Sequence, residues 1–342
     1  MREYAGISVV ICCYNSAKKI IPTLEHLAKQ ENPCSLSYEL IIVDNNCIDD
    51  TIALANEIWL SLAAPFPLKV VKQPIPGLKH AKDKGINYAS YDYIVLCDDD
   101  NWLCDIYLFT VYQLFAAMPK VAVIGGVGEP VFETKRPSWF NEIGGFGYAI
   151  GEEGRETGLV NSVYGAGMAI RKEIYFAVMN NEIDSVIIGR TGSRLLSGED
   201  IELCMFIKRA GYDILFNGTL KFKHFLTGNR LTWNYYLKLR SSFGKASAYL
   251  RLYNDEELLA FAMHKKNSLK EAGSLLKFAA FHFKFLLFPY LFKNAQCANF
   301  IQQWSMRITS LVENKKIKIL ADAKIQRLKN EKLALKHEKN IC

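Results

Sequence analysis

The stretch Val95-Leu96-Cys97-Asp98-Asp99-Asp100-Asn101 joins an apolar segment directly to a run of carboxylates. Because residues 93–97 are apolar and rich in β-formers, we expect them to form a buried strand. Side chains alternate along a strand, so Asp98 and Asp100 can share one side of it. Buried carboxylates need a cation or a proton, and hard oxygen ligands suit Mg²⁺ or Mn²⁺. The stretch therefore indicates a metal site, with a solvated acidic turn as the alternative.

Strands and helices alternate in the part of the chain before this stretch. Ser16 is a suitable N-cap for the first helix. Alternation of this kind predicts an α/β fold with a doubly wound, mostly parallel sheet, whose ligands bind at the carboxyl ends of the strands. Tyr14, Asp44 and the acidic run all fall at such ends, which favours a shared site. The expected elements are strands at 7–13, 40–43 and 68–71 and helices at about 17–30, 49–61 and 78–89.

The middle of the chain is less regular. Residues 128–158 are rich in Gly, Pro and aromatic residues, and a long irregular stretch in a compact domain is often a binding loop. The small residues of Gly165–Arg171 predict a strand that a ligand or another backbone approaches closely. The expected elements are strands at 121–124, 165–171, 213–216 and 220–225 and a helix at about 201–210.

Charge divides the 342 residues into two parts. Residues 1–225 hold 21 Lys and Arg against 27 Asp and Glu, a net charge of −6, and residues 226–342 hold 21 against 8, a net charge of +13. We therefore expect a catalytic domain over 1–225 and a basic helical region over 226–342. The nine cysteines are scattered without CxxC spacing, and no signal peptide is visible, which favours a reduced, cytoplasmic protein.

The C-terminal region is both basic and apolar. Residues 275–288 form an intensely apolar run in which Lys277 and Lys284, together with Lys270, recur every seven residues. This pattern favours a partly amphipathic helix at an anionic membrane surface, with a helix packed on the catalytic domain as the alternative. It argues against a spanning helix and against nucleic-acid binding. Residues 314–340 predict a basic, helical tail.

Six ordered motifs together resemble the family 2 glycosyltransferases, which are inverting nucleotide-sugar enzymes with a GT-A fold. No motif is specific alone, but their order and spacing are, and the resemblance covers about residues 6–246. The motifs are Val10–Asn15, Ile42–Thr51, Gly77–Gly85, Asp98–Trp102, Gly165–Met168 and Gly198–Leu203.

The resemblance implies a donor site at the strand ends. Asp44 would accept hydrogen bonds from the base or ribose, and Tyr14 would pack near the base, unless it is simply a half-buried tyrosine. Asp98 and Asp100 form the D-x-D motif and would neutralise the diphosphate through Mg²⁺ or Mn²⁺, whereas Asp99 would support the loop or contact the ribose. The other residues implied to bind the nucleotide sugar are Asn15, Asn45, Gly77 and Lys82.

The resemblance also implies a general base. Asp200 matches the carboxylate that takes the proton from the acceptor hydroxyl, and Glu199 is the alternative. Taken without the other motifs, the two acids would simply complement a helix dipole. His224 would face the metal or phosphate, or else be an ordinary core histidine.

Two positions depart from the family pattern. Asn45 stands where the family usually has Asp, and Lys82-Asp83 stands where it has Arg-Asn. Lys82 can still meet a phosphate as a point charge, but without the bidentate geometry of arginine. These departures affect the expected details of donor binding. The residues expected to bind the acceptor are Trp102, Trp139, Gly165 and Met168.

The sequence thus predicts a glycosyltransferase that uses a UDP- or GDP-linked sugar and a saccharide or lipid-linked saccharide acceptor. We expect it in the cytoplasm, peripheral to the inner face of the cell membrane, in the synthesis of cell-surface polysaccharide. One alternative is a non-catalytic scaffold of a polysaccharide-assembly complex. A sugar nucleotidyltransferase is disfavoured, because Cys13-Tyr14-Asn15-Ser16 replaces the Gly-rich, Arg-containing loop of those enzymes.

Overall fold

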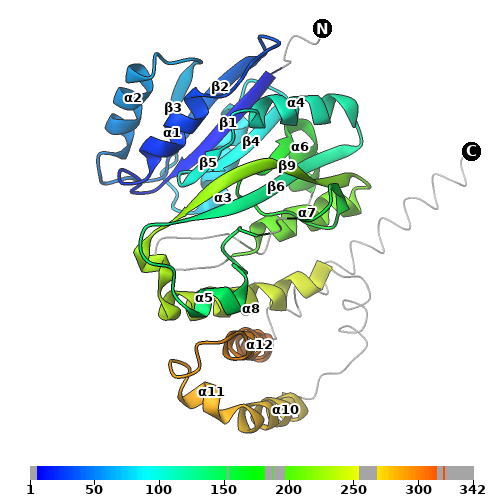
Figure 1. The fold of residues 1–342 in the computed structure, drawn as a ribbon. Coiled ribbons are helices and arrows are strands. Elements are labelled where there is room, and N and C mark those ends of the chain that lie inside the picture. Colours follow the sequence, from blue (N-terminus) through cyan, green and yellow to red (C-terminus); the bar gives the residue numbers. More distant parts are fainter. Residues whose placement is uncertain are drawn as a thin grey trace, which may run out of the picture. The chain divides into compact units, whose positions relative to one another are not determined.

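The computed structural model describes residues 6–151, 154–181, 187, 197–253, 268–313 and 319 (Figure 1). The chain divides into two compact units, Met1–Tyr235 and Tyr236–Cys342. The division falls inside helix α8 (Trp233–Leu250), ten residues beyond the boundary expected from charge.

The first unit is built on one mixed sheet with the strand order β3-β2-β1-β4-β8-β6-β9-β5, and β7 pairs with β9. Strands β1 to β4 run parallel, as do β6 and β9, whereas β5, β7 and β8 run antiparallel to their neighbours. The predicted mostly parallel α/β sheet is thereby confirmed. The strands are β1 (Gly6–Cys13), β2 (Ser37–Asp44), β3 (Leu68–Lys72), β4 (Tyr93–Asp98), β5 (Asn101–Leu103), β6 (Val121–Phe132), β7 (Gly158–Val160), β8 (Ala169–Arg171) and β9 (Asp213–Leu226).

Helices cover both faces of this sheet, and for that reason β1, β2 and β4 are almost continuously apolar. Val9 of β1 belongs to the core formed with α1, α2 and α4, whereas Val10 points to α3. A Cβ at Gly85 of α3 would lie 2.3 Å from a methyl group of Val10, so this helix can approach the sheet only with glycine there. The helices are α1 (Ile20–Ala28), α2 (Thr51–Ser61), α3 (Leu78–Tyr88), α4 (Tyr107–Ala117), α5 (Trp139–Ile143), α6 (Lys172–Asn181), α7 (Glu199–Arg209) and the 3₁₀ turn η1 (Gly228–Leu231).

Three local predictions were wrong. Helix α1 begins at Ile20 without a side-chain cap, because residues 17–19 form a turn in which the Lys19 and Ile20 amides donate to the Ser16 carbonyl. The Ser16 hydroxyl donates to the Asp99 carboxylate. Residues 165–168 form a turn, in which Gly167 has a φ of 68°, so strand β8 begins only at Ala169. The two short strands expected at 213–225 are one strand, β9, because β6 pairs with it along its whole length, from Asp213 to Leu226.

The second unit contains the 3₁₀ turn η2 (Arg251–Tyr253), α10 (Ser268–Phe281), α11 (Phe283–Leu287) and α12 (Ala295–Val312). The single helix expected at 275–288 is broken at His282. Phe300 of α12 packs against Phe278 and Phe285, with ring centroids 5.4 and 6.0 Å away. Within the described residues, no helix has the length and apolar character needed to cross a membrane. The expected tail at 314–340 lies outside the described residues, apart from residue 319.

Candidate active site

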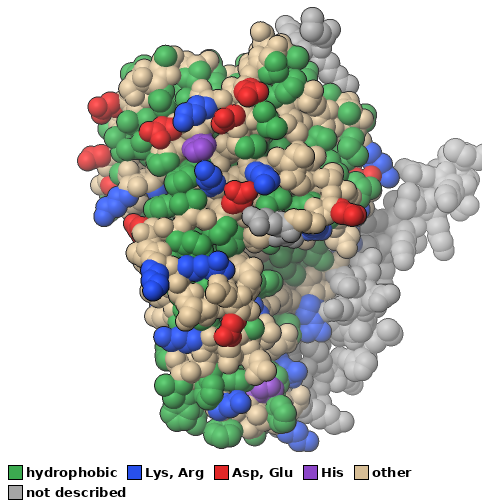
Figure 2. All heavy atoms as spheres, viewed as in Figure 1, with side chains coloured by type: hydrophobic (Ala, Val, Ile, Leu, Met, Phe, Trp, Pro, Cys, Tyr) green, Lys and Arg blue, Asp and Glu red, His purple; other side chains and the backbone are tan. Residues whose placement is uncertain are grey.

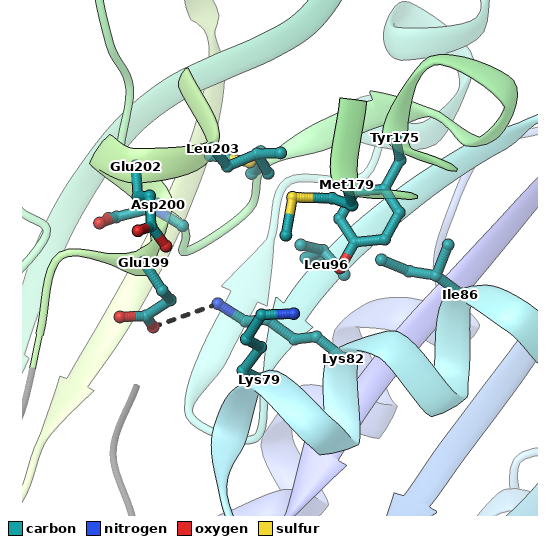
Figure 3. Close-up of a pocket in the computed structure, with 12 residues that line it drawn as sticks. Lys79, Lys82, Ile86, Leu96, Tyr175, Met179, Glu199, Asp200, Glu202 and Leu203 are labelled. Atoms are coloured by element: carbon teal, nitrogen blue, oxygen red, sulfur yellow. Dashed lines mark hydrogen bonds and ion pairs between the residues drawn. The ribbon is translucent and has the colours of Figure 1, made fainter. Parts of the chain in front are cut away.

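A pocket lies between α3, α6 and α7, next to Leu96 near the carboxyl end of β4 (Figure 3). Ile86 of α3 and Met179 of α6 contribute apolar walls. The polar end is formed by Lys82 of α3 and by Glu199 and Asp200 of α7, and Figure 3 shows the Lys82 and Glu199 side chains pointing toward each other. Parallel strands bring ligands to their carboxyl ends, so this is where the fold predicts substrate to bind.

Asp200 is held at the start of α7 by backbone donors. Its Oδ2 accepts a hydrogen bond of 3.0 Å from the Gly165 amide, and its Oδ1 accepts one of 2.9 Å from Ile201. Burial raises the pKa of Asp200, and the neighbouring Glu199 raises it further, against the opposing effect of Lys82. A positioned carboxylate with a raised pKa in a pocket has the properties of a general base.

Lys82 lies near both the α7 carboxylates and the acidic loop, which consists of Asp98, Asp99 and Asp100. Its Nζ lies 3.5 Å from Glu199 Oε1. Burial by itself lowers the pKa of Lys82, but Glu199, Asp98 and Asp200 together raise it, so the side chain stays charged. A Cβ at Gly165 would lie 3.4 Å from this ammonium group and 3.6 Å from Asp200 Oδ2. Glycine therefore leaves open the space between the lysine and the carboxylate.

Asp99 supports the loop rather than facing the pocket. Its carboxylate accepts from the Ser16 hydroxyl and, at 2.7 Å, from Lys19 Nζ, while its carbonyl accepts from the Thr23 hydroxyl at 3.0 Å. These contacts join the acidic loop to the β1–α1 connection. Burial raises the pKa of Asp99, partly offset by Lys19.

Asp100 and His224 meet because β5 pairs with β9, which sets Asn101 opposite His224. His224 Nε2 lies 3.4 Å from Asp100 Oδ1, and Arg230 Nη1 lies 3.0 Å from Asp100 Oδ2. Burial favours the neutral acid, but His224, Arg230 and Lys19 outweigh it and hold the pKa of Asp100 far below its ordinary value. Asp100 is thus a buried, permanent negative charge.

The Asp100–His224 pair has the donor chemistry of a divalent-cation site, with one carboxylate and one imidazole. Within the described residues, no set of three or more His, Cys, Asp or Glu side chains could enclose a metal alone. Mg²⁺ is usually held by one or two carboxylates together with substrate phosphates, so a pair fits a cation that a diphosphate completes. Asp98 raises the pKa of both Lys82 and Arg230, so it lies near both. It stays a predicted ligand.

Asn45 is the best-defined residue of the predicted nucleotide site. Its Nδ2 donates to the carbonyls of Gln73 and Ile75, both at 2.8 Å, and its Oδ1 accepts from the Gly77 amide at 2.9 Å. An aspartate could not make the two donated bonds. The side chain therefore joins the end of β2 to the β3–α3 connection, and the departure from the family pattern has a structural reason.

The other predicted nucleotide residues surround this junction. Asp44 accepts from the Cys47 amide at 2.9 Å, and Asn15 accepts from the Ile48 amide at 2.9 Å. Tyr14 is 54% exposed, so its ring is accessible to a planar ligand. Gly77, with a φ of 141°, precedes α3 and Lys82. The structure thus groups Tyr14, Asn15 and Asp44 on two neighbouring strand ends, β1 and β2.

The residues predicted to bind the acceptor lie in separate places. Gly165 and Met168 line the pocket. Trp102 is stacked between His26 and Phe225, each 5.8 Å away. Trp139 is buried and packs edge-on against Trp233 at 5.2 Å. The acceptor role of both tryptophans stays a prediction, and in this structure each is part of an aromatic cluster.

The sequence prediction missed the cations of the acidic loop. Lys19 and Arg230 contact it from positions 80 and 130 residues away in the chain. One sequence signal could have pointed to Arg230. This residue comes just after Gly228-Asn229, in the loop that follows the strand containing His224, and ligands bind at strand ends of this kind.

Comparison with known proteins relates this chain to a protein family and to a known fold. The sequence model described as Glycosyl transferase family 2 matches residues 8–176, which contain β1 to β4, the acidic loop and Gly165. This part of the chain belongs to glycosyl transferase family 2. Residues 177–342, including the α7 acids and the second unit, lie beyond the match.

Two curated relatives show how far the similarity extends. The glucosyl-dolichyl phosphate glucuronosyltransferase of Haloferax volcanii is 21% identical over 300 residues, covering 79% of this chain and 88% of that protein. The poly-β-1,6-N-acetyl-D-glucosamine synthase of Staphylococcus epidermidis is 27% identical over 125 residues, covering 36% of this chain. The match spans only 29% of the synthase, so it concerns a part of that protein.

Among solved structures, the mannosyltransferase PcManGT from Pyrobaculum calidifontis, in complex with GDP-Man and Mn²⁺, has a similar fold. The TM-score is 0.54, over 92% of this chain and 88% of that one, at 17% identity. The likeness confirms the GT-A fold predicted from the sequence.

Proposed function

We propose that this chain is an inverting glycosyltransferase that moves a sugar from a UDP- or GDP-linked donor to a saccharide or lipid-linked saccharide. The observation that carries the proposal is the pocket at the sheet edge, where Asp200 has a raised pKa and lies next to the Lys82–Glu199 ion pair. A scaffold protein has no need for a buried cluster of charges of this kind, because burying charges costs stability.

The chain's own residues would act as follows. Asp200, deprotonated, accepts the proton of the acceptor hydroxyl as the oxygen bonds to the anomeric carbon. The bond between that carbon and the diphosphate oxygen breaks, and the nucleoside diphosphate leaves with the electron pair. One base suffices, because a single displacement forms no sugar–enzyme bond. Lys82 stabilises the negative charge of Asp200 and Glu199 before the transfer.

The donor would lie along the strand ends. Tyr14, Asn15 and Asp44 would take the nucleoside, at the ends of β1 and β2. Asp98, Asp100 and His224 would hold Mg²⁺ or Mn²⁺, which supplies neutralising charge to the diphosphate when bound. The lines of support are the Asp100–His224 contact of 3.4 Å and the charge of Asp98, which raises the pKa of both Lys82 and Arg230.

The test of the base compares three variants in a transfer assay with UDP- and GDP-sugar panels. Asp200→Asn keeps the size of the side chain but cannot accept the proton, so kcat should fall by about 10²–10⁴-fold. In Glu199→Gln, kcat should fall less. Asp213→Asn should leave kcat unchanged, because Asp213 lies at the start of β9 and pairs with Lys120 and Lys208, away from the pocket residues. Full turnover by the Asp200 variant would sink the assignment.

A lipid-linked acceptor and a membrane surface form the second part of the proposal. One relative is named for a dolichyl phosphate-linked sugar, and the second unit exposes large apolar side chains around α10 and α11. Figure 2, in the same view as Figure 1, shows hydrophobic and basic side chains gathered there. The exposed apolar residues of this segment are Leu276, Phe281, Phe283, Leu286, Leu287, Phe288, Tyr290 and Leu291.

The exposed apolar side chains of α10 and α11 are not the ones that pack these helices against α12. Phe278 and Phe285 already supply the contact with α12, whereas Phe281 and Leu291 are 83% and 76% exposed. Apolar patches of this size mark interaction sites. Lys277 and Lys284 lie among them and suit anionic headgroups. We infer that the segment lies on the inner face of the cell membrane, where it would bring the pocket to its acceptor.

Vesicle sedimentation tests this inference with the full chain. The double variant Phe281→Ser, Leu291→Ser should lose most binding to vesicles that contain an anionic phospholipid, because it removes two exposed apolar anchors. Leu60→Ser is the matched control, since Leu60 on α2 is 73% exposed but lies in the first unit. Equal binding by all three proteins would exclude the surface.

A further inference from the structure

Arg230 contacts both Asp100 and His224, the two residues that form the candidate cation site. It lies on η1, four residues beyond the end of β9, and reaches back to the Asp100–His224 pair. Its Nη1 is 3.0 Å from Asp100 Oδ2 and 3.3 Å from His224 Nε2. One guanidinium nitrogen thus contacts both of the groups that have the donor chemistry of a cation site.

The contact with His224 has a chemical consequence. A guanidinium group has donors only, so a hydrogen bond from Arg230 to the imidazole uses the lone pair of His224 Nε2, the atom that also lies 3.4 Å from Asp100 Oδ1. That lone pair is the one a metal ion would take. Ligand atoms lie about 2.0–2.1 Å from Mg²⁺. An ion bound to Asp100 Oδ2 and His224 Nε2 would therefore collide with Arg230 Nη1 and repel its charge. Arg230 and a divalent cation exclude each other.

Arg230 is also incompletely held in its present position. Its Nε is buried and makes no hydrogen bond with any residue that the structure describes, and the same is true of His224 Nδ1. An unpaired buried donor destabilises the folded state, so contacts with the described residues do not satisfy all the donors of Arg230 in this position. The guanidinium keeps donors available for an anion.

We propose that Arg230 is an internal counter-cation, which holds the Asp100–His224 pair in the metal-free protein and has to move away before a divalent cation binds there. The proposal rests on the metal-assisted transfer proposed above. This arrangement gives the nucleotide-free protein a low affinity for metal, because the state in which Arg230 has moved away is only a fraction of the population. An arriving diphosphate offers the displaced guanidinium a new partner.

The test measures Mn²⁺ binding to the nucleotide-free full chain, by electron paramagnetic resonance of free Mn²⁺. Arg230→Gln should bind Mn²⁺ about tenfold more tightly than the wild type, because the competing state is gone. Lys19→Gln is the matched control: it removes one positive charge from the same cluster, 3.7 Å from Asp100, but leaves the Arg230 contacts in place. It should tighten binding by no more than about threefold.

Adding Asp100→Asn to the Arg230→Gln variant should abolish the gain in Mn²⁺ affinity. This loss would show that the ion binds at Asp100. If thermal unfolding shows that Arg230→Gln does not fold, Arg230→Met, which keeps an apolar stem, replaces it. Unchanged affinity in the Arg230 variant, or an equal gain from Lys19→Gln, would overturn the proposal. No sugar transfer is measured, so either result leaves the Asp200 test of the proposed function independent.

Discussion

Replacing Asn45 by aspartate would bring the sequence closer to the usual family pattern and should nevertheless weaken the fold. The Asn45 side chain is buried and makes three hydrogen bonds to the β3–α3 connection. An aspartate keeps only the bond accepted from the Gly77 amide. Its second oxygen would face the carbonyls of Gln73 and Ile75 at the distances, 2.8 Å, that the amide now bridges.

The magnitude follows from these contacts. Each lost hydrogen bond is worth about 1 kcal/mol net, and leaving a buried carbonyl without a donor adds about 1 kcal/mol or more. The free energy of unfolding should therefore fall by about 2–4 kcal/mol. A proton on the new carboxyl restores one donor, so its pKa is raised in the folded state. The loss of stability should consequently be smaller in mild acid and grow as the pH rises.

Urea unfolding at several pH values, followed by circular dichroism, measures this loss. Asn46→Asp is the matched control, because Asn46 is less buried and its amide donates to Pro74 and Gln73 over 3.1 and 3.4 Å. Its cost should stay below about 1 kcal/mol. The reasoning is refuted if both variants lose the same stability, or if the loss in Asn45→Asp does not depend on pH.

Two further predictions concern ionisable groups. Because Asp200 must be deprotonated to act as a base, the acidic limb of kcat against pH should move to lower pH in Glu199→Gln and to higher pH in Lys82→Met; movement in the same direction would contradict the assigned charges. For Glu39, burial raises the pKa, but hydrogen bonds led by Lys69 outweigh it and lower the pKa. Glu39→Gln should therefore cost stability at neutral pH, and urea unfolding should show the difference from wild type fading as the pH falls below 4.5.

The first half of the fold was predictable because local patterns of apolar and polar residues indicate its strands. Strands β1, β2 and β4 are buried on both faces, so each appears as a largely apolar run ending in polar residues, with Ser8 and Glu39 as interruptions. Patterns failed where a tertiary contact decided the outcome. Ser16 is a good helix cap by type, but helix α1 starts only at Ile20, and the Ser16 hydroxyl donates to Asp99, 83 residues away. Nothing local distinguishes the two outcomes.

The site was predictable to the extent that its residues lie at strand ends. Asp200 could be assigned to the site from sequence because a Glu-Asp pair opens a helix. Its raised pKa could not be predicted, because it depends on burial and on the charges of Glu199 and Lys82 in the folded structure. Arg230 could not be placed in this way. Its partner Asp100 is 130 residues away, and their contact depends on the pairing of β5 with β9.

The pairing of β9 constrains how such chains can change in length. β9 aligns with β6 and β5, and that alignment sets His224 opposite Asn101. One residue inserted between Leu220 and His224 would turn the imidazole to the other face of the sheet, since strand side chains have a period of two. The long connection between β6 and β7 carries no such restriction. Relatives that retain this site should therefore accumulate insertions and deletions in that connection while β9 keeps a fixed residue count.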